Sequence, residues 1–271
     1  MTDFISSILL GLVQGITEWL PISSTAHLLL VEQFASLSLS ASAKEFFFVA
    51  IQFFSILAVV ILFFGELNPI TKNPIKRLAT LNLWLKIIIA TIPAAIMGVL
   101  FDDLIDEYLH GPFVLALTLA LYGVLYIILE QSKSMKSKIR STTSLTLLSY
   151  KQAFFLGLFQ VLALIPGTSR SGSTILGGLL LGLSRPVAAH FSFFMAIPVI
   201  AGATLLKVLK LGLTFSTQEW LIIASGGVTA FVLSLLVMKR LLAFLKSHTF
   251  IGFGYYRIAL ALLILLFGKG A

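Results

Sequence analysis

The sequence predicts an all-α polytopic membrane protein: an inverted repeat with six transmembrane helices plus two re-entrant helical hairpins. Three observations lead to this prediction. Of the 271 residues, 58% are hydrophobic and only 11% are charged, whereas soluble domains are about 25% charged. The apolar character is continuous rather than alternating, which favours helices over barrel strands. One polar, proline-broken segment interrupts it in each half of the chain.

Six stretches have the roughly 20 apolar residues that a span requires. They are residues 46–64, 85–101, 113–130, 188–207, 219–238 and 250–267. Basic residues lie between them at 72–77, 133–140 and 239–246, and an acidic loop is predicted at 102–107. Basic loops stay in the cytoplasm, so we expect the acidic loop outside, with Lys207 and Lys210 as an exception. This bias explains the net charge of +8, and nucleic acid is not an expected partner.

The two interrupted segments, residues 5–40 and 151–184, are apolar but broken near the middle by Gly, Pro and Ser. Irregular backbone survives at membrane depth only where protein or water satisfies its polar groups. We therefore expect each segment to be a re-entrant helix–loop–helix whose tip reaches toward the membrane midplane. The alternative is that residues 4–20 and 22–37 form two ordinary thin spans.

Matching motifs indicate an internal duplication. Residues 10–14 (LGLVQ) match 156–160 (LGLFQ), and residues 47–51 (FFVAI) match 193–197 (FFMAI), both at an offset of 146 residues. We predict a single membrane domain, 1–271, with repeat one at about 1–130, a cytoplasmic loop at 131–150 and repeat two at about 151–271. Three spans per half would invert the second half, so that the two tips meet at the repeat interface.

The first segment offers a candidate metal site. Gln14 and Glu18 are four residues apart and share one face of a helix. A carboxylate with an amide oxygen suits a hard divalent cation, Mg²⁺ or Ca²⁺, that also binds phosphate oxygens of a substrate. The alternative is structural: Glu18 would form a buried ion pair with Arg170 of the second segment, which does not exclude catalysis.

Hydroxyl groups follow at the break itself. Pro21 discourages continuation of the helix, and the three residues that it exposes are Ser23, Ser24 and Thr25. Ser23 or Ser24 could instead cap the next helix, whose N-terminus is itself suited to phosphate. His27 lies in the same motif and could act as a general acid or base or as a direct nucleophile.

The second segment resembles a phosphate cradle. Gly167 and Gly172 allow close backbone approach, and Arg170 supplies the planar fork that suits phosphate oxygens. Hydroxyl donors surround the arginine: Ser169, Ser171, Ser173 and Thr174. No Gly-Lys-Ser/Thr follows, so this is not a Walker A loop. The structural alternative is a snorkelling arginine beside small-residue helix packing.

Together the motifs resemble those of the bacterial undecaprenyl-diphosphate phosphatase family, also called the bacitracin-resistance protein. The family pattern is Glu/Gln-x-x-x-Glu running into Pro-x-Ser-Ser-Thr-x-His, followed by Pro-Gly-x-Ser-Arg-Ser-Gly-x-Thr. Here these stand at Gln14 to Glu18, Pro21 to His27 and Pro166 to Thr174. The resemblance covers essentially the whole chain, including the Tyr256-Arg257 pair.

The resemblance implies six spans with two re-entrant hairpins in the bacterial cytoplasmic membrane. It also implies an outward-facing site that removes the terminal phosphate of a polyprenyl diphosphate lipid. Glu18 and Gln14 would serve the divalent metal or orient the attacking group, and Ser24 or His27 would be the nucleophile or proton carrier. Arg170, with its neighbouring hydroxyls, would hold the diphosphate. Gln14 is the uncharged family option, so Glu18 must carry more of any metal binding.

A transporter or flippase for polyprenyl-phosphate lipids is the main rival, because inverted repeats with broken helices are typical of transporters. A transporter would need Arg170 but has less use for Ser24, His27 and Glu18 together. A scaffold without catalytic activity would leave this polar cluster unexplained. Membrane lipids are the expected surroundings, a homodimer remains open, and the absence of cysteine excludes disulfides and thiolate chemistry.

Overall fold

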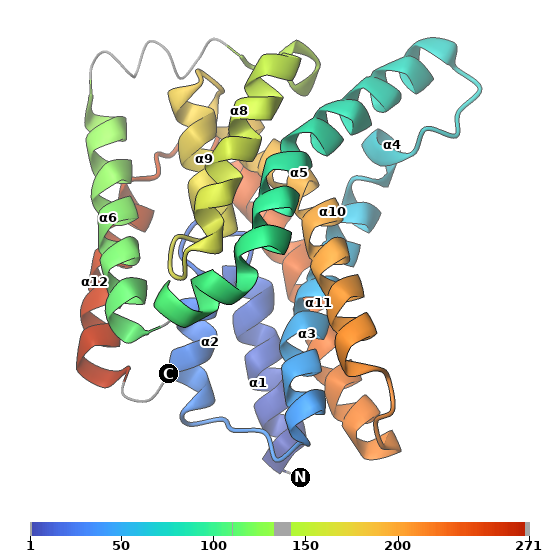
Figure 1. The fold of residues 1–271 in the computed structure, drawn as a ribbon. Coiled ribbons are helices and arrows are strands. Elements are labelled where there is room, and N and C mark those ends of the chain that lie inside the picture. The colour runs from blue at the N-terminus through green and yellow to red at the C-terminus, as the bar shows by residue number, and fades with distance from the viewer. Residues whose placement is uncertain (1, 110, 133–141, 269–271) are drawn as a thin grey trace.

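The computed structural model describes residues 2–109, 111–132 and 142–268, and over these residues the chain is helical without a β-strand (Figure 1). One isolated parallel bridge joins Thr142 to Leu183. The helices run side by side as a bundle, and short connections link most of them (Figure 1). The predicted all-α membrane class is confirmed. Residues 133–141, which form part of the predicted cytoplasmic loop at 131–150, lie outside the described residues.

Five helices are long and apolar enough to cross a membrane. They are α3 (Ala41–Leu62), α5 (Pro74–Leu109, with Pro74–Phe101 as the apolar part), α6 (Pro112–Gln131), α10 (Arg185–Leu211) and α11 (Thr217–Phe244). Each overlaps one of the predicted spans. The sixth predicted span, 250–267, corresponds to α12 (Ile251–Phe267), which has 17 residues. That length is at the lower end of what a span requires.

The acidic stretch at 102–107 is not a loop, which corrects the sequence prediction. Helix α5 continues through it to Leu109. Charged residues do not by themselves end a helix, whereas glycine and proline do. The chain turns only at Gly111, which has φ 142°, and Pro112 then opens α6.

Each interrupted segment forms a helical hairpin. The first consists of α1 (Thr2–Thr17) and α2 (Ser24–Glu32). The second consists of α8 (Tyr150–Val161), the short η2 (Leu162–Leu164) and α9 (Arg170–Leu180). At 1.5 Å per residue, α2 and α9 are about 14 and 17 Å long, roughly half of a hydrocarbon core. Such lengths do not fit a span at 22–37.

The hairpins pack crosswise between the two halves of the chain. Helix α1 lies against α11, and α8 lies against α5, while α3 packs on α10 and α6 on α12. Small residues permit the close approach of α1 to α11: a Cβ placed on Gly11 would overlap the carbonyl of Gly226. Small residues at helix contacts are the usual means of tight packing in membranes. Each hairpin is therefore held by a helix that lies far away in sequence.

We predict that Gly11→Ala lowers the stability of the protein in detergent by about 1–3 kcal/mol, because the added methyl group forces α1 away from α11. The measurement is the midpoint of thermal unfolding of the purified protein. Gly202→Ala on α10 is the matched control, since nothing lies within 4 Å of its added Cβ. Equal midpoints for the two variants would contradict the tight packing of α1 on α11.

Candidate functional site

The turn of each hairpin ends in a serine that caps the second helix. Ser23 Oγ accepts a hydrogen bond from the backbone N–H of Ala26 at the start of α2, at 3.4 Å. Ser169 Oγ accepts one from the backbone N–H of Gly172 at the start of α9, at 3.1 Å. This confirms the capping predicted for Ser23 or Ser24 and assigns it to Ser23.

The two capping serines share a strained backbone. Ser23 has φ 71° and Ser169 has φ 70°, and they are the non-glycine residues with positive φ among those described. They are separated by the same 146 residues as the repeated motifs. A non-glycine residue in this region costs about 1–3 kcal/mol and persists where the surroundings require it, often at functional sites. The strain therefore singles out both tips.

The two tips meet at the carboxylate of Glu18. Arg170 Nη2 lies 2.8 Å from Glu18 Oε1 as an ion pair, and Ser24 Oγ donates to Glu18 Oε2 at 2.8 Å. Gln14 Nε2 also donates to Glu18 Oε2, at 3.0 Å. The Glu18 side chain is only 8% exposed. Ser24 and Arg170 are the first residues of α2 and α9, so one carboxylate joins the N-terminal ends of both helices.

Arg170 is fixed from three sides. Its Nη1 donates to the backbone carbonyl of Ser192 on α10 at 2.8 Å, and its guanidinium lies 5.5 Å from the centre of the Trp19 ring. Nε is buried and has no hydrogen-bond partner among the described residues. The alternative of a snorkelling arginine is therefore wrong, because the side chain reaches into the protein and is held there.

His27 lies one turn along α2 from Ser24. Its Nδ1 is 2.7 Å from the carbonyl of Ser23, and its Nε2 is 2.8 Å from the hydroxyl of Tyr256. A carbonyl only accepts, so Nδ1 carries the proton, and in the neutral ring Nε2 accepts from the tyrosine hydroxyl. The two rings also stack with an interplanar angle of 5°. Tyr256, which the family resemblance includes, thus orients the imidazole.

Three further residues that were predicted to bind the substrate lie on α9 and make hydrogen bonds within the protein: Ser171, Ser173 and Thr174. Ser171 Oγ donates to the carbonyl of Leu20 at 3.0 Å and so ties α9 to the first tip. Ser173 Oγ donates to the carbonyl of Phe159, and Thr174 Oγ1 is 2.7 Å from Ser192 Oγ. All three are buried, so these hydroxyls hold the fold.

Thr25 is the predicted substrate-binding residue that the structure leaves apart from this network. It is exposed and its side chain makes no hydrogen bond within the described part of the chain. Thr25 follows Ser24, which contacts the Glu18 carboxylate, in the first turn of α2. Its assignment to the substrate stays a prediction.

Arg257 of α12 is a structural residue of the site that the sequence analysis noted in the family resemblance without assigning it a role. It is fully buried. Its Nη1 donates to the Pro21 carbonyl at 3.1 Å, and its Nη2 donates to the carbonyls of Gly167 and Thr168 at 2.9 and 3.0 Å. Arg257 therefore clamps the backbone of both tips. A charged residue within an apolar span was the available signal, since such residues are functional by default.

The Glu18 carboxylate and the Gln14 side-chain oxygen could supply part of the coordination of a hard divalent cation. Gln14 Oε1 is buried, has no hydrogen-bond partner and belongs to the amide that contacts Glu18. Among the described residues, no group of three His, Cys, Asp or Glu side chains is placed to hold a metal. Mg²⁺ commonly uses one or two carboxylates and takes its other ligands from water and substrate phosphates. Glu18 and Gln14 meet that minimum.

Apolar, membrane-length helices enclose an ion pair and several hydroxyl groups, which defines a multi-pass membrane protein with a polar centre at two hairpin tips. Comparison with known proteins specifies it further. The chain belongs to the bacitracin resistance protein BacA family, whose model matches residues 7–263. It is 48% identical to an undecaprenyl-diphosphatase of Enterococcus faecalis, over 97% of this chain and 96% of the relative. It is 49% identical to undecaprenyl-diphosphatase 1 of Clostridioides difficile, over 98% and 96% respectively.

We predict that Arg257→Lys destabilises the protein while Arg240→Lys, an exposed control on α11, does not. One ammonium cannot reach carbonyls on both tips, and each buried carbonyl left unpaired costs about 1–3 kcal/mol. The midpoint of thermal unfolding in detergent measures the loss. A normal midpoint for Arg257→Lys would show that the tips hold their backbone without the guanidinium.

Proposed function

We propose that this protein is an integral-membrane phosphatase that hydrolyses undecaprenyl diphosphate to undecaprenyl phosphate and inorganic phosphate. Relatives at 48–49% identity over nearly the whole chain carry the name undecaprenyl-diphosphatase. The observation that carries the proposal is the junction of Glu18, Ser24 and Arg170, which unites a base, a hydroxyl and a phosphate-binding fork. Hydrolysis recycles the lipid carrier for cell-wall synthesis and, as the family name indicates, confers bacitracin resistance.

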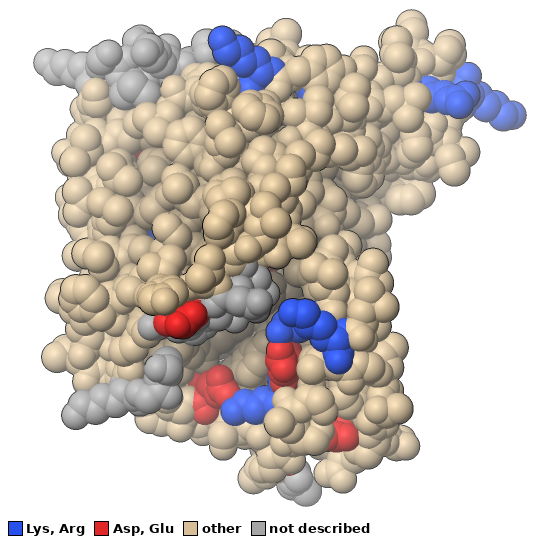
Figure 2. All heavy atoms as spheres, in the orientation of Figure 1, with Lys and Arg blue, Asp and Glu red and all other residues tan. Residues whose placement is uncertain are grey.

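The proposed topology is an inverted repeat of six spans and two re-entrant hairpins in the bacterial cytoplasmic membrane. The crosswise packing of α1 on α11 and α8 on α5 supports it, as do the short second arms of both hairpins. In the view of Figure 2, the upper end carries lysine and arginine alone, whereas acidic and basic side chains mix in the lower half. By the positive-inside rule, this supports a cytoplasmic upper end, and we propose that the site faces outward.

Substrate binding rests on Arg170 and on two helix ends. The N-termini of α2 and α9 meet at Glu18 through their first residues, and helix N-termini attract phosphate groups. Arg170 Nε has no protein partner among the described residues, so it can donate to a phosphate oxygen. The polyprenyl tail remains in the bilayer, which suits a site reached laterally from lipid.

The geometry favours Ser24 as the nucleophile. Ser24 Oγ donates to Glu18 Oε2, so the carboxylate can take its proton as Oγ attacks the terminal phosphorus. The anhydride P–O bond breaks, and undecaprenyl phosphate leaves with that proton. A water molecule then attacks the phosphorus of the phosphoserine. The hydroxyl group of this water remains on the released phosphate, and the other proton of the water passes through Glu18 to Ser24 Oγ. Both nitrogens of His27 are engaged, which suits it to positioning α2.

A divalent cation, Mg²⁺ or Ca²⁺, would be held by Glu18 and Gln14. When bound, it would neutralise charge on the phosphate oxygens. Arg170 supplies the same kind of stabilisation from the protein and needs no reorganisation during the reaction. One chain makes the whole junction, so a homodimer is not required for activity and stays a prediction.

We expect Glu18→Ala and Arg170→Ala each to lower the rate of phosphate release from undecaprenyl diphosphate by about 10²–10³-fold. The assay uses purified protein in detergent, with and without a chelator. Glu32→Ala is the control, because Glu32 forms only a surface ion pair with Lys44. Normal turnover in both Glu18→Ala and Arg170→Ala would overturn the assignment of the active site. Wild-type turnover that a chelator does not change would overturn only the proposed role of the metal. Lipid movement without phosphate release would favour the transporter.

Ser24→Ala should abolish formation of a phosphoenzyme, whereas His27→Gln should retain it at a reduced rate, because His27 positions α2 and does not attack. Rapid quenching followed by peptide mass spectrometry locates the phosphoryl group. A phosphoryl group on the peptide with His27 but not Ser24 would reverse the two roles. Thr25→Ala is the matched control for loss of a hydroxyl in the same turn.

A further inference from the structure

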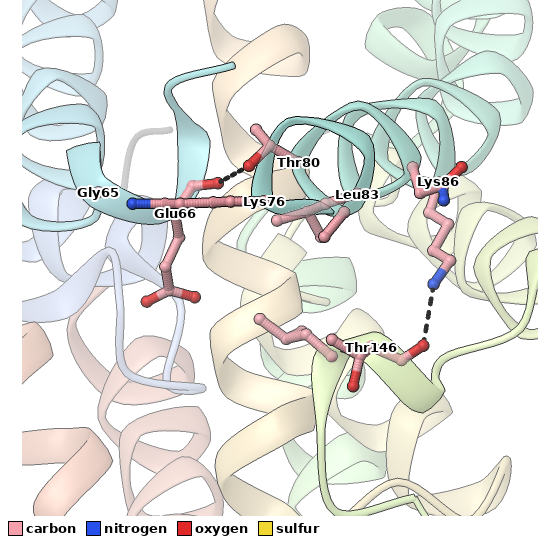
Figure 3. A pocket seen from close by; sticks show the side chains of 10 residues that line it. Gly65, Glu66, Lys76, Thr80, Leu83, Lys86 and Thr146 are labelled. Carbon is pink, nitrogen blue, oxygen red and sulfur yellow. Dashed lines mark hydrogen bonds between the residues drawn. The ribbon is translucent and has the colours of Figure 1, made fainter. Parts of the chain in front are cut away.

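A cavity with two lysines in its lining lies apart from the Glu18 junction. It has a volume of about 350 Å³ and lies between α4 (Phe64–Leu67), the first half of α5 and η1 (Leu145–Leu147) (Figure 3). Two lysines of α5, Lys76 and Lys86, line it together with Thr80, Asn82 and Thr146. None of these residues contacts Glu18 or Arg170. The proposed hydrolysis therefore leaves this cavity unused.

Lys86 is the unusual residue of the cavity. It is only 8% exposed, and its ammonium donates one long hydrogen bond, 3.4 Å, to the carbonyl of Thr146. The Nζ also lies 5.8 Å from the centre of the Tyr150 ring. Within the described part of the chain Lys86 forms no ion pair. A buried charge requires a partner, and an ammonium has three donors, so Lys86 can donate to an anionic group that enters the cavity.

Lys76, which is exposed, supplies a second positive charge at the other end of the cavity. It lies ten residues before Lys86 on the same lined face of α5, and a helix rises about 15 Å over that distance. Figure 3 shows the two side chains at opposite ends of the cavity. Lys86 can therefore hold one anionic group inside while Lys76 contacts whatever extends from it.

The one carboxylate that lines the cavity belongs to Glu66 and does not neutralise Lys86. Glu66 Oε1 lies 3.6 Å from His190 Nε2, and Figure 3 shows the carboxylate at the end of the cavity away from Lys86. Burial raises the pKa of Glu66 above its ordinary value.

We propose that this cavity binds a phosphate group through Lys86, with Lys76 at its other end contacting what extends from that group, and that an anionic phospholipid headgroup supplies the phosphate. Lysine binds phosphate as a point charge, and basic pockets between spanning helices bind lipid headgroups on the cytoplasmic side. An exposed apolar stripe on α5 runs beside the lined face: Ile75, Leu78, Leu81 and Leu85. Acyl chains can lie along this stripe while the headgroup enters the cavity, which free phosphate would not require.

The test compares binding of dioleoyl-phosphatidylglycerol to wild type, Lys86→Gln and Lys246→Gln in detergent. Lys246 is exposed beyond α11, so its substitution removes the same charge elsewhere. Thermal stabilisation by the lipid gives the affinity, and native mass spectrometry counts the bound molecules. We expect Lys86→Gln to bind about tenfold more weakly than Lys246→Gln, with one fewer retained lipid.

A second arm replaces the lipid with inorganic phosphate in the Arg170→Ala background, which removes binding at the hydrolytic site. Thermal stabilisation by phosphate but not by phosphatidylglycerol would overturn the assignment to lipid. If Lys86→Gln also abolished that stabilisation by phosphate, the phosphate site itself would be supported. Equal lipid and phosphate binding by Lys86→Gln and Lys246→Gln would overturn the proposal. Unchanged phosphatase activity of Lys86→Gln shows that the variant is folded. Lys76→Gln, at the end of the cavity opposite Lys86, should weaken binding less.

Discussion

Irregular backbone inside an apolar protein must find its hydrogen-bond partners within the protein, and this requirement shapes the whole centre. Both hairpin tips expose carbonyls that their own helices cannot satisfy. Arg257 supplies the donors for Pro21 on one tip and for Gly167 and Thr168 on the other. One guanidinium from α12 therefore sets the distance between the tips, and the position of every reactive side chain follows from it.

The two tips use one backbone design for two chemical tasks. Ser23 and Ser169 share the same strained conformation and the same capping bond. The residue that follows differs: Ser24 in the first tip and Arg170 in the second. Both residues begin a helix and contact the Glu18 carboxylate, so matching backbone geometry presents a hydroxyl group on one side and a guanidinium group on the other.

The Glu18–Arg170 pair is better explained by function than by stability. Desolvation of two buried charges offsets most of their attraction, so a buried pair adds little net stability. Here each partner keeps further hydrogen bonds, to Ser24 and Gln14 on one side and to the Ser192 carbonyl on the other. These contacts leave the carboxylate within reach of the Ser24 proton. The deeper hydroxyls, Ser173 and Thr174, are used to hold α9 against its neighbours.

Local sequence determined the membrane class, the six apolar stretches, the two broken segments and the polar residues within them, because continuous apolarity and the effects of Pro and Gly act over a few residues. It left open whether Glu18 pairs with Arg170 and which serine caps α2, and it misplaced the end of α5. Arg170 contacts Glu18 across a sequence separation of 152 positions, and Arg257 contacts Pro21 across 236 positions. These contacts arise only when α9 and α12 pack beside the first tip. Tertiary structure alone decided them, because side-chain identity does not specify which distant backbone carbonyls a buried guanidinium will meet.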